Sequence, residues 1–280
     1  MKIGIIGYGF VGKALAAGIK EGVNILRIDP LLDTSVSDLE EFNPEICFIC
    51  VPTPMNKDGS QDLRILTEVI SNLKNISITP LIVLKSTVLP NNIESIRNEI
   101  PDLVLNPEFL RERSAKEDFL NSELILFGGP QESTKKLADF YKKYTLCKTT
   151  DFKFTDLISA SLVKYAINTF LATKVVFFNE LNQIFNRSGA EDSWEDFIKM
   201  ISIDKRVGSS HMQVPGPDGK FGYGGACFPK DSKALIKYSE KVGSPFSLLQ
   251  KTNQVNDRIR KKYISLSDRE IDQNVNYESD

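Results

Sequence analysis

The feature that most constrains the fold is a glycine-rich turn, Gly7-Tyr8-Gly9-Phe10-Val11-Gly12, which follows an apolar run and precedes a helical one. The first glycine of such a turn permits a tight bend, the second lets the backbone approach a pyrophosphate, and the third lets helix and strand pack closely. Asp29 ends the next predicted strand, at the spacing expected of a ribose-binding acid. The pattern predicts a dinucleotide site, with an ordinary glycine turn as the alternative. The acid favours NAD over NADP because it would repel a 2′-phosphate.

The first half of the chain alternates short apolar runs with helical patterns. Strands are predicted at residues 2–7, 24–29, 45–51, 80–85, 103–106 and 124–128, and helices at 11–19 and 62–73. The uninterrupted apolar run at 45–51 is typical of a strand that is buried on both faces. This order predicts an α/β, Rossmann-type domain over residues 1–150, built on a doubly wound parallel sheet.

The pattern changes near residue 151. A long segment without helix breakers predicts a central helix over residues 155–186, and further helices are predicted at 194–201, 231–241 and 247–263. Residues 204–228 are rich in glycine and proline and read as a loop. We therefore expect an all-helical domain over 151–265, followed by a polar, frayed tail at 266–280.

Composition excludes several classes of function. The 35 Lys and Arg nearly balance the 37 Asp and Glu, so no nucleic-acid surface or polybasic membrane patch is expected. No uninterrupted apolar run reaches the roughly 20 residues of a membrane span, and no signal peptide is seen. The single histidine, His211, excludes a histidine-rich zinc site, and acid–base work must fall to Lys, Asp, Glu, Cys or water.

The four cysteines do not form a disulfide framework, which favours a reducing cytoplasm. Cys47 and Cys50 lack the second pair that a zinc site needs, so we interpret them as buried core residues. No metal site is expected.

Polar residues follow two of the predicted strands. One segment runs Cys50-Val51-Pro52-Thr53-Pro54 and the other runs Lys85-Ser86-Thr87-Val88. Open parallel sheets hold their ligands at the carboxyl ends of their strands, so both segments are candidates for the ligand-binding edge. The alternative is that each is simply a polar entry into a loop.

The long helix carries Lys164 and Asn168, which lie on one helical face because they are four residues apart. Apolar residues surround them, and a buried ammonium is costly without partners. Lys164 therefore either belongs to a site or extends its ammonium to solvent. Glu108 and Glu112 follow a strand, and by themselves they read more readily as surface charges.

The most specific segment is Gly222-Tyr223-Gly224-Gly225-Ala226-Cys227-Phe228-Pro229-Lys230-Asp231. Its glycines bring backbone close to a ligand, and its cysteine stands just before a predicted helix. A helix amino terminus and a neighbouring lysine both favour the thiolate form of a cysteine. A buried structural cysteine is the alternative, but it would not account for the Lys and Asp that follow.

Taken in order, these segments resemble the nucleotide-sugar 6-dehydrogenases, the UDP-glucose and GDP-mannose dehydrogenase family. The matching motifs are GYGFVG, CVPTP, KSTV, NPEFLRE, KYAIN, DKRVG and GYGGACFPKD. The resemblance implies an NAD-dependent oxidation of a sugar nucleotide's primary alcohol, of the UDP-glucose type, for polysaccharide biosynthesis. It also implies a homodimer through the central helix.

The resemblance further implies individual roles. Cys227 would be the nucleophile, Lys164 and Asn168 would stabilise an oxyanion, and Asp231 and Thr87 would orient a water. Glu108 would act near the same carbon in hydrolysis or acid–base chemistry, and Arg206 would reach the substrate of a neighbouring subunit. The implied cofactor contacts are Gly7, Gly9, Phe10, Val11, Gly12, Asp29, Val51, Pro52, Thr53, Ser86, Thr87, Glu112 and Lys230. The implied substrate contacts are Glu108, Phe109, Leu110, Lys164, Asn168, Arg206, Tyr223 and Gly224.

The resemblance covers residues 1 to about 263, whereas members of the family continue into a third, nucleotide-binding domain. A second departure is the inserted run Val214-Pro215-Gly216-Pro217-Asp218-Gly219. Two alternatives stay open: an enzyme like the 3-hydroxyacid dehydrogenases, which share the Lys-x-x-x-Asn helix but need no cysteine, and a non-catalytic NAD-binding remnant.

Overall fold

The computed structural model describes residues 1–263 and 265–277. The chain divides into two compact units: Met1–Thr53 with Asp62–Lys164, and Pro54–Gln61 with Tyr165–Asp280. This division differs from the predicted boundary at about 150 in two ways. The first turns of the long helix belong to the first unit, and the loop at 54–61 belongs to the second although both its flanks are in the first.

The first unit is built on a seven-stranded sheet in the order β2-β1-β3-β4-β5-β6-β7. All neighbouring strands run parallel except β5 and β6. The strands are β1 (Lys2–Ile6), β2 (Asn24–Ile28), β3 (Ile46–Ile49), β4 (Leu81–Leu84), β5 (Val104–Leu105), β6 (Leu126–Gly128) and β7 (Lys153–Thr155). The predicted Rossmann-type, mainly parallel fold is confirmed.

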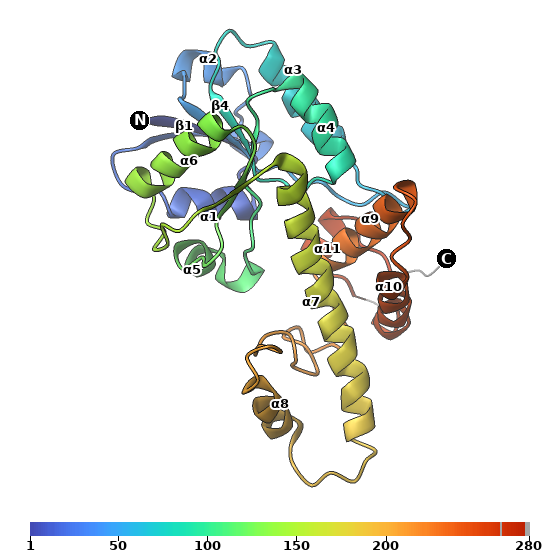
Figure 1. Cartoon of the computed structure of the whole chain (residues 1–280). Coiled ribbons are helices and arrows are strands. Elements are labelled where there is room, and N and C mark those ends of the chain that lie inside the picture. The colour runs from blue at the N-terminus through green and yellow to red at the C-terminus, as the bar shows by residue number, and fades with distance from the viewer. Residues whose placement is uncertain (264, 278–280) are drawn as a thin grey trace. The chain divides into compact units, whose positions relative to one another are not determined.

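Helices cover both faces of this sheet (Figure 1). They are α1 (Phe10–Ala17), α2 (Asp38–Phe42), α3 (Arg64–Lys74), α4 (Pro90–Glu99), α5 (Ala115–Leu120) and α6 (Gln131–Tyr144), with short 3₁₀ turns at Pro30–Leu32 and Glu112–Ser114. Successive residues of β3 alternate between the two apolar clusters, because side chains of a strand point to opposite faces. Cys47 packs with Leu66 of α3, and Phe48 packs in the cluster of Leu15 and Leu137 from α1 and α6.

The strand β7 corrects the prediction that everything beyond residue 150 is helical. It pairs in parallel with β6, and Phe154 lies opposite Phe127. Its three residues are too few for a periodic pattern, and only pairing with β6 gives their backbone groups partners.

The second unit is helical apart from its loops. It contains most of α7 (Leu157–Phe185), together with α8 (Trp194–Ser202), α9 (Phe228–Lys241), α10 (Ser247–Arg260) and α11 (Asp268–Asp272). At the carboxyl end of α7, the ring of Phe185 stacks against Trp194 and Phe197 of α8. Nearer its middle, Ala172 and Val176 pack with Tyr223 and with Val255 of α10.

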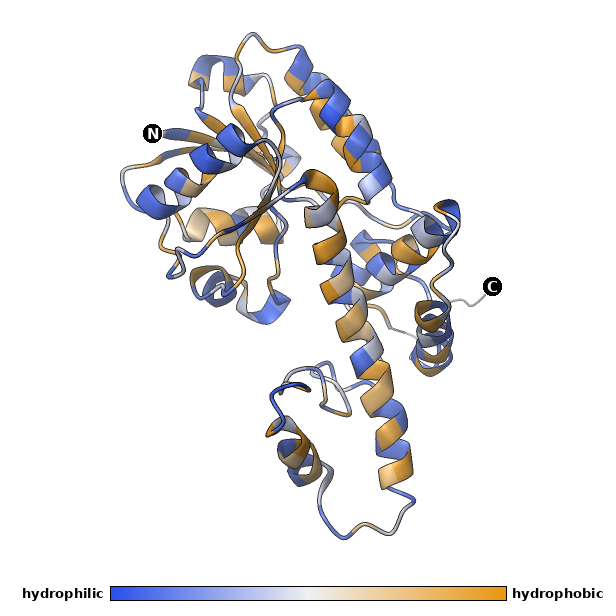
Figure 2. Cartoon of the chain, viewed as in Figure 1, coloured by the Kyte–Doolittle hydropathy of each residue, from blue (hydrophilic) through white to orange (hydrophobic). Residues whose placement is uncertain are grey.

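The helix α7 is apolar along most of its length (Figure 2). Contrary to the sequence expectation, its length and composition alone would allow it to cross a membrane. Half of its most apolar window is buried inside the protein, however, and polar side chains such as Lys174 and Asn179 are hydrogen-bonded along it. These properties are those of a core helix.

The tail differs from the predicted frayed segment. Ser267 caps α11, and Ser267 and Glu270 form a reciprocal capping box. Val275 and Tyr277 beyond it are buried, at 4% and 8% exposure. Polar composition misled the prediction, because the tail is held by hydrogen bonds to residues far away in the sequence, such as Gly225 and Lys233. The last part of the predicted tail, residues 278–280, lies outside the described residues.

Candidate active site

The glycine turn has the geometry that its sequence predicts. Gly7 has a φ of +87°, and a Cβ there would lie 2.8 Å from the carbonyl carbon of Cys50. A Cβ on Gly12 would lie 2.3 Å from the Gly7 oxygen, so the turn and the start of α1 can pack only as glycine. A Cβ on Gly9, the N-cap of α1, would meet nothing within 4 Å. The backbone at Gly9 is thus open to a bound group, and the residues present fit a dinucleotide pyrophosphate.

Asp29 is held against this turn. One of its carboxylate oxygens accepts the Tyr8 N–H at 2.7 Å and the other accepts the Leu31 N–H at 3.0 Å. Both oxygens retain lone pairs for ribose hydroxyls, and the charge disfavours a 2′-phosphate. Phe10 and Val11 form the half-buried first turn of α1.

The two strand-end segments meet as predicted. The Ser86 hydroxyl donates to the Val51 carbonyl at 2.7 Å, and the Thr53 hydroxyl donates to the Thr87 carbonyl at 2.8 Å. Pro52 is exposed between them. These cofactor candidates form one hydrogen-bonded rim at the carboxyl edge of the sheet. Glu112 is exposed at the start of a 3₁₀ turn.

A buried ion pair lies in the same unit. Lys164, 4% exposed, donates from Nζ to the Glu108 carbonyl at 2.5 Å and to its Oε1 at 3.1 Å. The ring of Phe109 lies 5.4 Å from Nζ, and the Glu108 Oε2 accepts the Leu110 N–H at 2.6 Å. Burial opposes ionisation of Glu108, but the Lys164 charge, the hydrogen bonds from Leu110 and Lys164 and the Lys85 charge together lower the carboxyl's pKa. The lysine therefore does not extend to solvent, and Glu108 is ionised at neutral pH.

Sequence reasoning overlooked a second buried cation, Lys85. Its ammonium donates to the side-chain oxygen of Asn106 at 2.9 Å, and the Tyr141 hydroxyl donates to the same oxygen at 2.6 Å. Burial lowers the pKa of Lys85, and the charge on Glu108 opposes this shift. Lys85 and Glu108 line a cavity of about 20 Å³, room for one water. The lysine at the end of an apolar strand was the signal that could have found it.

The second unit contains the other polar cluster. Asp231, 1% exposed, accepts the Asn168 Nδ2 at 2.7 Å and the Lys230 Nζ at 2.6 Å. Lys230, predicted to contact the cofactor, is thus paired within this cluster. Asn168 lies one turn along α7 from Lys164, so one continuous helix carries both predicted oxyanion donors.

Cys227 is the half-buried N-cap residue of α9. The helix begins at Phe228, three residues before the predicted start, with Pro229 in its first turn, where a missing N–H costs nothing. The Cys227 carbonyl accepts the Asp231 N–H at 2.9 Å, so the cysteine and the acid belong to one helical turn.

Two predicted substrate residues lie elsewhere. The Tyr223 side chain is 3% exposed and donates from its hydroxyl to Asn253 at 3.2 Å. Arg206 lies on an exposed loop, paired with Asp204. Sequence reasoning missed Lys174, whose ammonium holds this loop through the Val207 carbonyl at 3.0 Å.

The chain matches known proteins along most of its length. Residues 32–145 match the NAD binding domain of the UDP-glucose/GDP-mannose dehydrogenase family, and residues 158–258 match that family's central domain. A UDP-glucose 6-dehydrogenase of Rickettsia bellii is 38% identical over 75% of this chain and 48% of its own length. A putative UDP-glucose 6-dehydrogenase of Bacillus subtilis is 33% identical over 92% of this chain and 68% of its own.

Among solved structures, a UDP-glucose dehydrogenase from Pyrobaculum islandicum superposes with a TM-score of 0.77 at 28% identity. That alignment covers 92% of this chain and 68% of the other. The chain spans about half the length of the Rickettsia relative.

Proposed function

Because the chain belongs to the UDP-glucose/GDP-mannose dehydrogenase family and its cofactor is NAD, we propose that it oxidises the primary alcohol of a UDP-glucose-type sugar nucleotide to the acid. One observation carries the proposal. Asp231, one turn into the helix that Cys227 caps, is hydrogen-bonded to Asn168, which lies one turn of α7 from Lys164. Nucleophile, acid and oxyanion donors are thereby linked through two helices.

Bound NAD would supply the hydride acceptor for each of the two oxidations at the sugar's sixth carbon, so that two NAD would be used per sugar. In the first oxidation, Lys164 and Asn168 stabilise the alkoxide that develops as the alcohol loses its proton. The Cys227 thiolate then adds to the aldehyde carbon, which prevents its escape and gives a thiohemiacetal. Loss of the second hydride converts this adduct into a thioester on Cys227.

Hydrolysis completes the reaction. Asp231 and Thr87 orient a water that attacks the thioester carbon, the carbon–sulfur bond breaks, and the Cys227 thiolate is restored. The lowered pKa of Glu108 supports a role as base rather than acid, because its carboxylate is ready to accept a proton.

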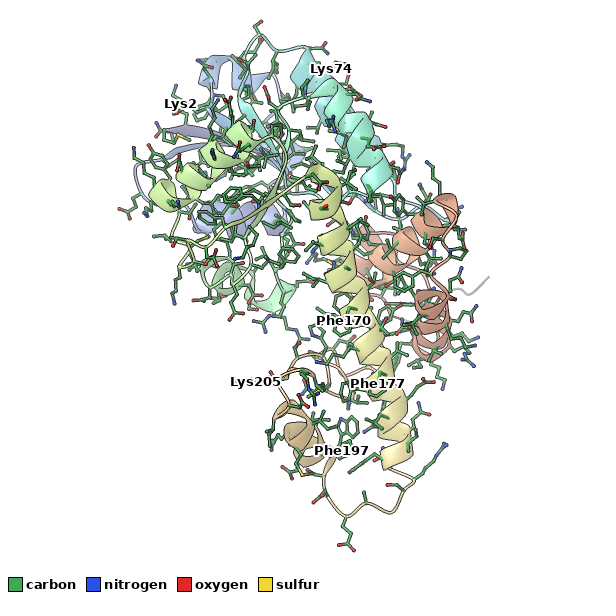
Figure 3. The ribbon with its side chains drawn as sticks, viewed as in Figure 1. Lys2, Lys74, Phe170, Phe177, Phe197 and Lys205 are labelled. Atoms are coloured by element: carbon green, nitrogen blue, oxygen red, sulfur yellow. The ribbon has the colours of Figure 1, made fainter. Side chains whose placement is uncertain are left out.

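We also propose that two copies pair along α7. Phe170, Phe177 and Ile184 recur every seven residues on this helix and are 59–66% exposed (Figure 3). Met200 and Ile203 at the end of α8 are also exposed. Exposed apolar side chains in such a row favour a protein partner, and their heptad spacing suits an identical helix. The exposure of Arg206 beyond α8 supports a contact with the substrate of the neighbouring subunit. Within the described residues the four cysteines are thiols rather than disulfides, which supports a cytoplasmic location.

The test is a turnover assay with NAD and UDP-glucose, with GDP-mannose and a small 3-hydroxyacid as comparison substrates. We expect two NADH per UDP-glucose, and no acid from Cys227→Ser. Cys147→Ser is the matched control and should keep full activity. Formation of one NADH per hydroxyacid, at a rate that Cys227→Ser does not reduce, would contradict the covalent mechanism. Binding of NAD without turnover of any sugar nucleotide would contradict it too.

A further inference from the structure

The backbone leading to Cys227 is held by side chains from several helices. We call residues 222–225 the glycine loop. Its Gly222 N–H donates to Asn179 of α7 at 2.9 Å, and its Gly222 carbonyl accepts from Arg260 of α10 at 2.8 Å. The Tyr223 N–H and carbonyl both bond to the side chain of Asn256, at 2.7 and 3.0 Å. The upstream half of the loop is therefore fixed at both of its peptide groups.

Two of the glycines serve these contacts. A Cβ on Gly222 would lie 2.6 Å from the Asn256 Oδ1, and a Cβ on Gly224 would lie 2.8 Å from the Arg260 Cζ. Gly225 differs: its φ is +77°, and a Cβ there would meet nothing within 4 Å. The close approach of Asn256 and Arg260 of α10 is therefore a structural reason for glycine at positions 222 and 224.

Gly225 is held from the tail. Its N–H donates at 3.0 Å to the Oε1 of Glu270, which is 5% exposed on α11. The same oxygen accepts the Tyr277 hydroxyl at 2.7 Å, and Oε2 accepts the backbone N–H and hydroxyl of Ser267 at 2.8 and 2.9 Å. The carboxylate is thus oriented by its own helix cap and by the end of the tail.

We propose that Glu270 is a positioning residue for the Cys227 thiol, acting through the backbone of Gly225. Asn256 fixes the chain at Tyr223, and α9 fixes it from Phe228 onward. Between those points, the hydrogen bond to Glu270 restrains the backbone two residues before Cys227. Loss of this bond lets the thiol leave the position that attack on an aldehyde requires.

The inference rests on the proposed function only for the reaction that the thiol serves. It predicts that Glu270→Ala lowers kcat about tenfold and leaves KM for NAD unchanged, because a small misplacement of a reacting group costs rate rather than cofactor binding. Glu270→Gln keeps an oxygen that can accept the Gly225 N–H and should recover most of the rate. Asp272→Ala, at an exposed position of the same helix, is the matched control and should behave as the wild type.

A second readout needs no turnover. The alkylation rate of Cys227 by iodoacetamide is followed by peptide mass spectrometry at about pH 9.5, where an ordinary thiol is mostly ionised and the rate reports access. We expect Glu270→Ala to raise this rate at least about threefold, because a released loop exposes the half-buried sulfur. The partly exposed Cys147 of the first unit is the internal standard and should not change.

The outcomes separate the two proposals. In one outcome, Glu270→Ala shows faster alkylation while the wild-type protein oxidises no sugar nucleotide. That result would support the positioning role and contradict the proposed dehydrogenase activity. Unchanged alkylation, or equal loss of kcat in the alanine and glutamine variants, would overturn the positioning role whatever the activity. If Glu270→Ala does not fold, Glu270→Asp replaces it. That variant keeps the charge but draws the carboxylate away from Gly225, and it should show the same two effects.

Discussion

Replacing Lys164 by methionine isolates the energetics of the buried Lys164–Glu108 ion pair. The two side chains are 5% and 8% exposed, and their charged atoms are 3.1 Å apart. Methionine has a similar length but no charge, so Glu108 loses the cation that keeps it ionised. Removing one partner of a buried pair costs about 3–5 kcal/mol, because the remaining charge is left in a poorly solvated site. The positive charge of Lys85 is close enough to act on Glu108, so we expect a loss near the lower end, about 3 kcal/mol.

The loss should depend on pH in a definite direction. In the wild type the pKa of Glu108 is lowered, so the pair stabilises the protein above the unfolded pKa of about 4.3, and this contribution fades as the pH falls through the folded pKa. In Lys164→Met the Lys164 charge no longer lowers the pKa of Glu108, so burial raises that pKa. The free energy of unfolding of the variant then falls as the pH rises through about 4.3. Its loss of stability relative to the wild type is therefore greatest at neutral pH and smaller in acid.

The assay is urea unfolding followed by circular dichroism at about pH 7 and about pH 4, which lie well above and just below the unfolded carboxyl pKa of about 4.3. Glu108→Gln and the double variant complete a cycle, in which the double variant should be more stable than the sum of the single losses predicts. Lys153→Met, which removes a lysine from an exposed ion pair, is the control and should change stability by less than about 1 kcal/mol. A loss below about 1 kcal/mol at neutral pH, or a loss that does not shrink in acid, would refute the reasoning.

Three further predictions concern other parts of the chain. Asp29→Ala should reduce the preference for NAD over NADP by about tenfold, measured as the ratio of kcat/KM values, because the charge that repels a 2′-phosphate is gone; an unchanged ratio would contradict the role of the acid. Gly7→Ala should lower the free energy of unfolding by at least about 1–3 kcal/mol, since its φ of +87° is strained for alanine and the new Cβ would meet Cys50; a stable variant would disprove the tight turn. Phe177→Glu should give a monomer in sedimentation velocity where the wild type gives a dimer, while the exposed Leu248→Glu on α10 should not; a dimeric Phe177→Glu would place the interface elsewhere.

The parts of the site that could be predicted are those encoded by neighbouring residues. Gly7 and Gly12 are required by a turn that spans six residues, and Lys164 and Asn168 share a helical face because of their spacing. Buried strands were recognisable as continuous apolar runs, so the alternation that produces the sheet was predictable. Cys227 was recognisable because a glycine-rich segment and a helix start enclose it.

Other features depend on contacts between distant residues, which no local pattern carries. The three-residue strand β7 forms because it can pair with β6, and Lys85 is tolerated in the core because Asn106 accepts a hydrogen bond from its ammonium. Tyr223 reads as a ligand contact, yet its ring packs against α7 and α10.

The glycine loop shows the same division between sequence and structure. The sequence by itself determined that the backbone before Cys227 must be flexible enough to turn sharply and approach another group. Only the tertiary structure decided that the group is a set of side chains from the protein itself. Glu270 belongs to a polar tail that hydrogen bonds to Gly225 and Lys233 hold in place. These contributions to the free energy arise only when segments far apart in the chain meet.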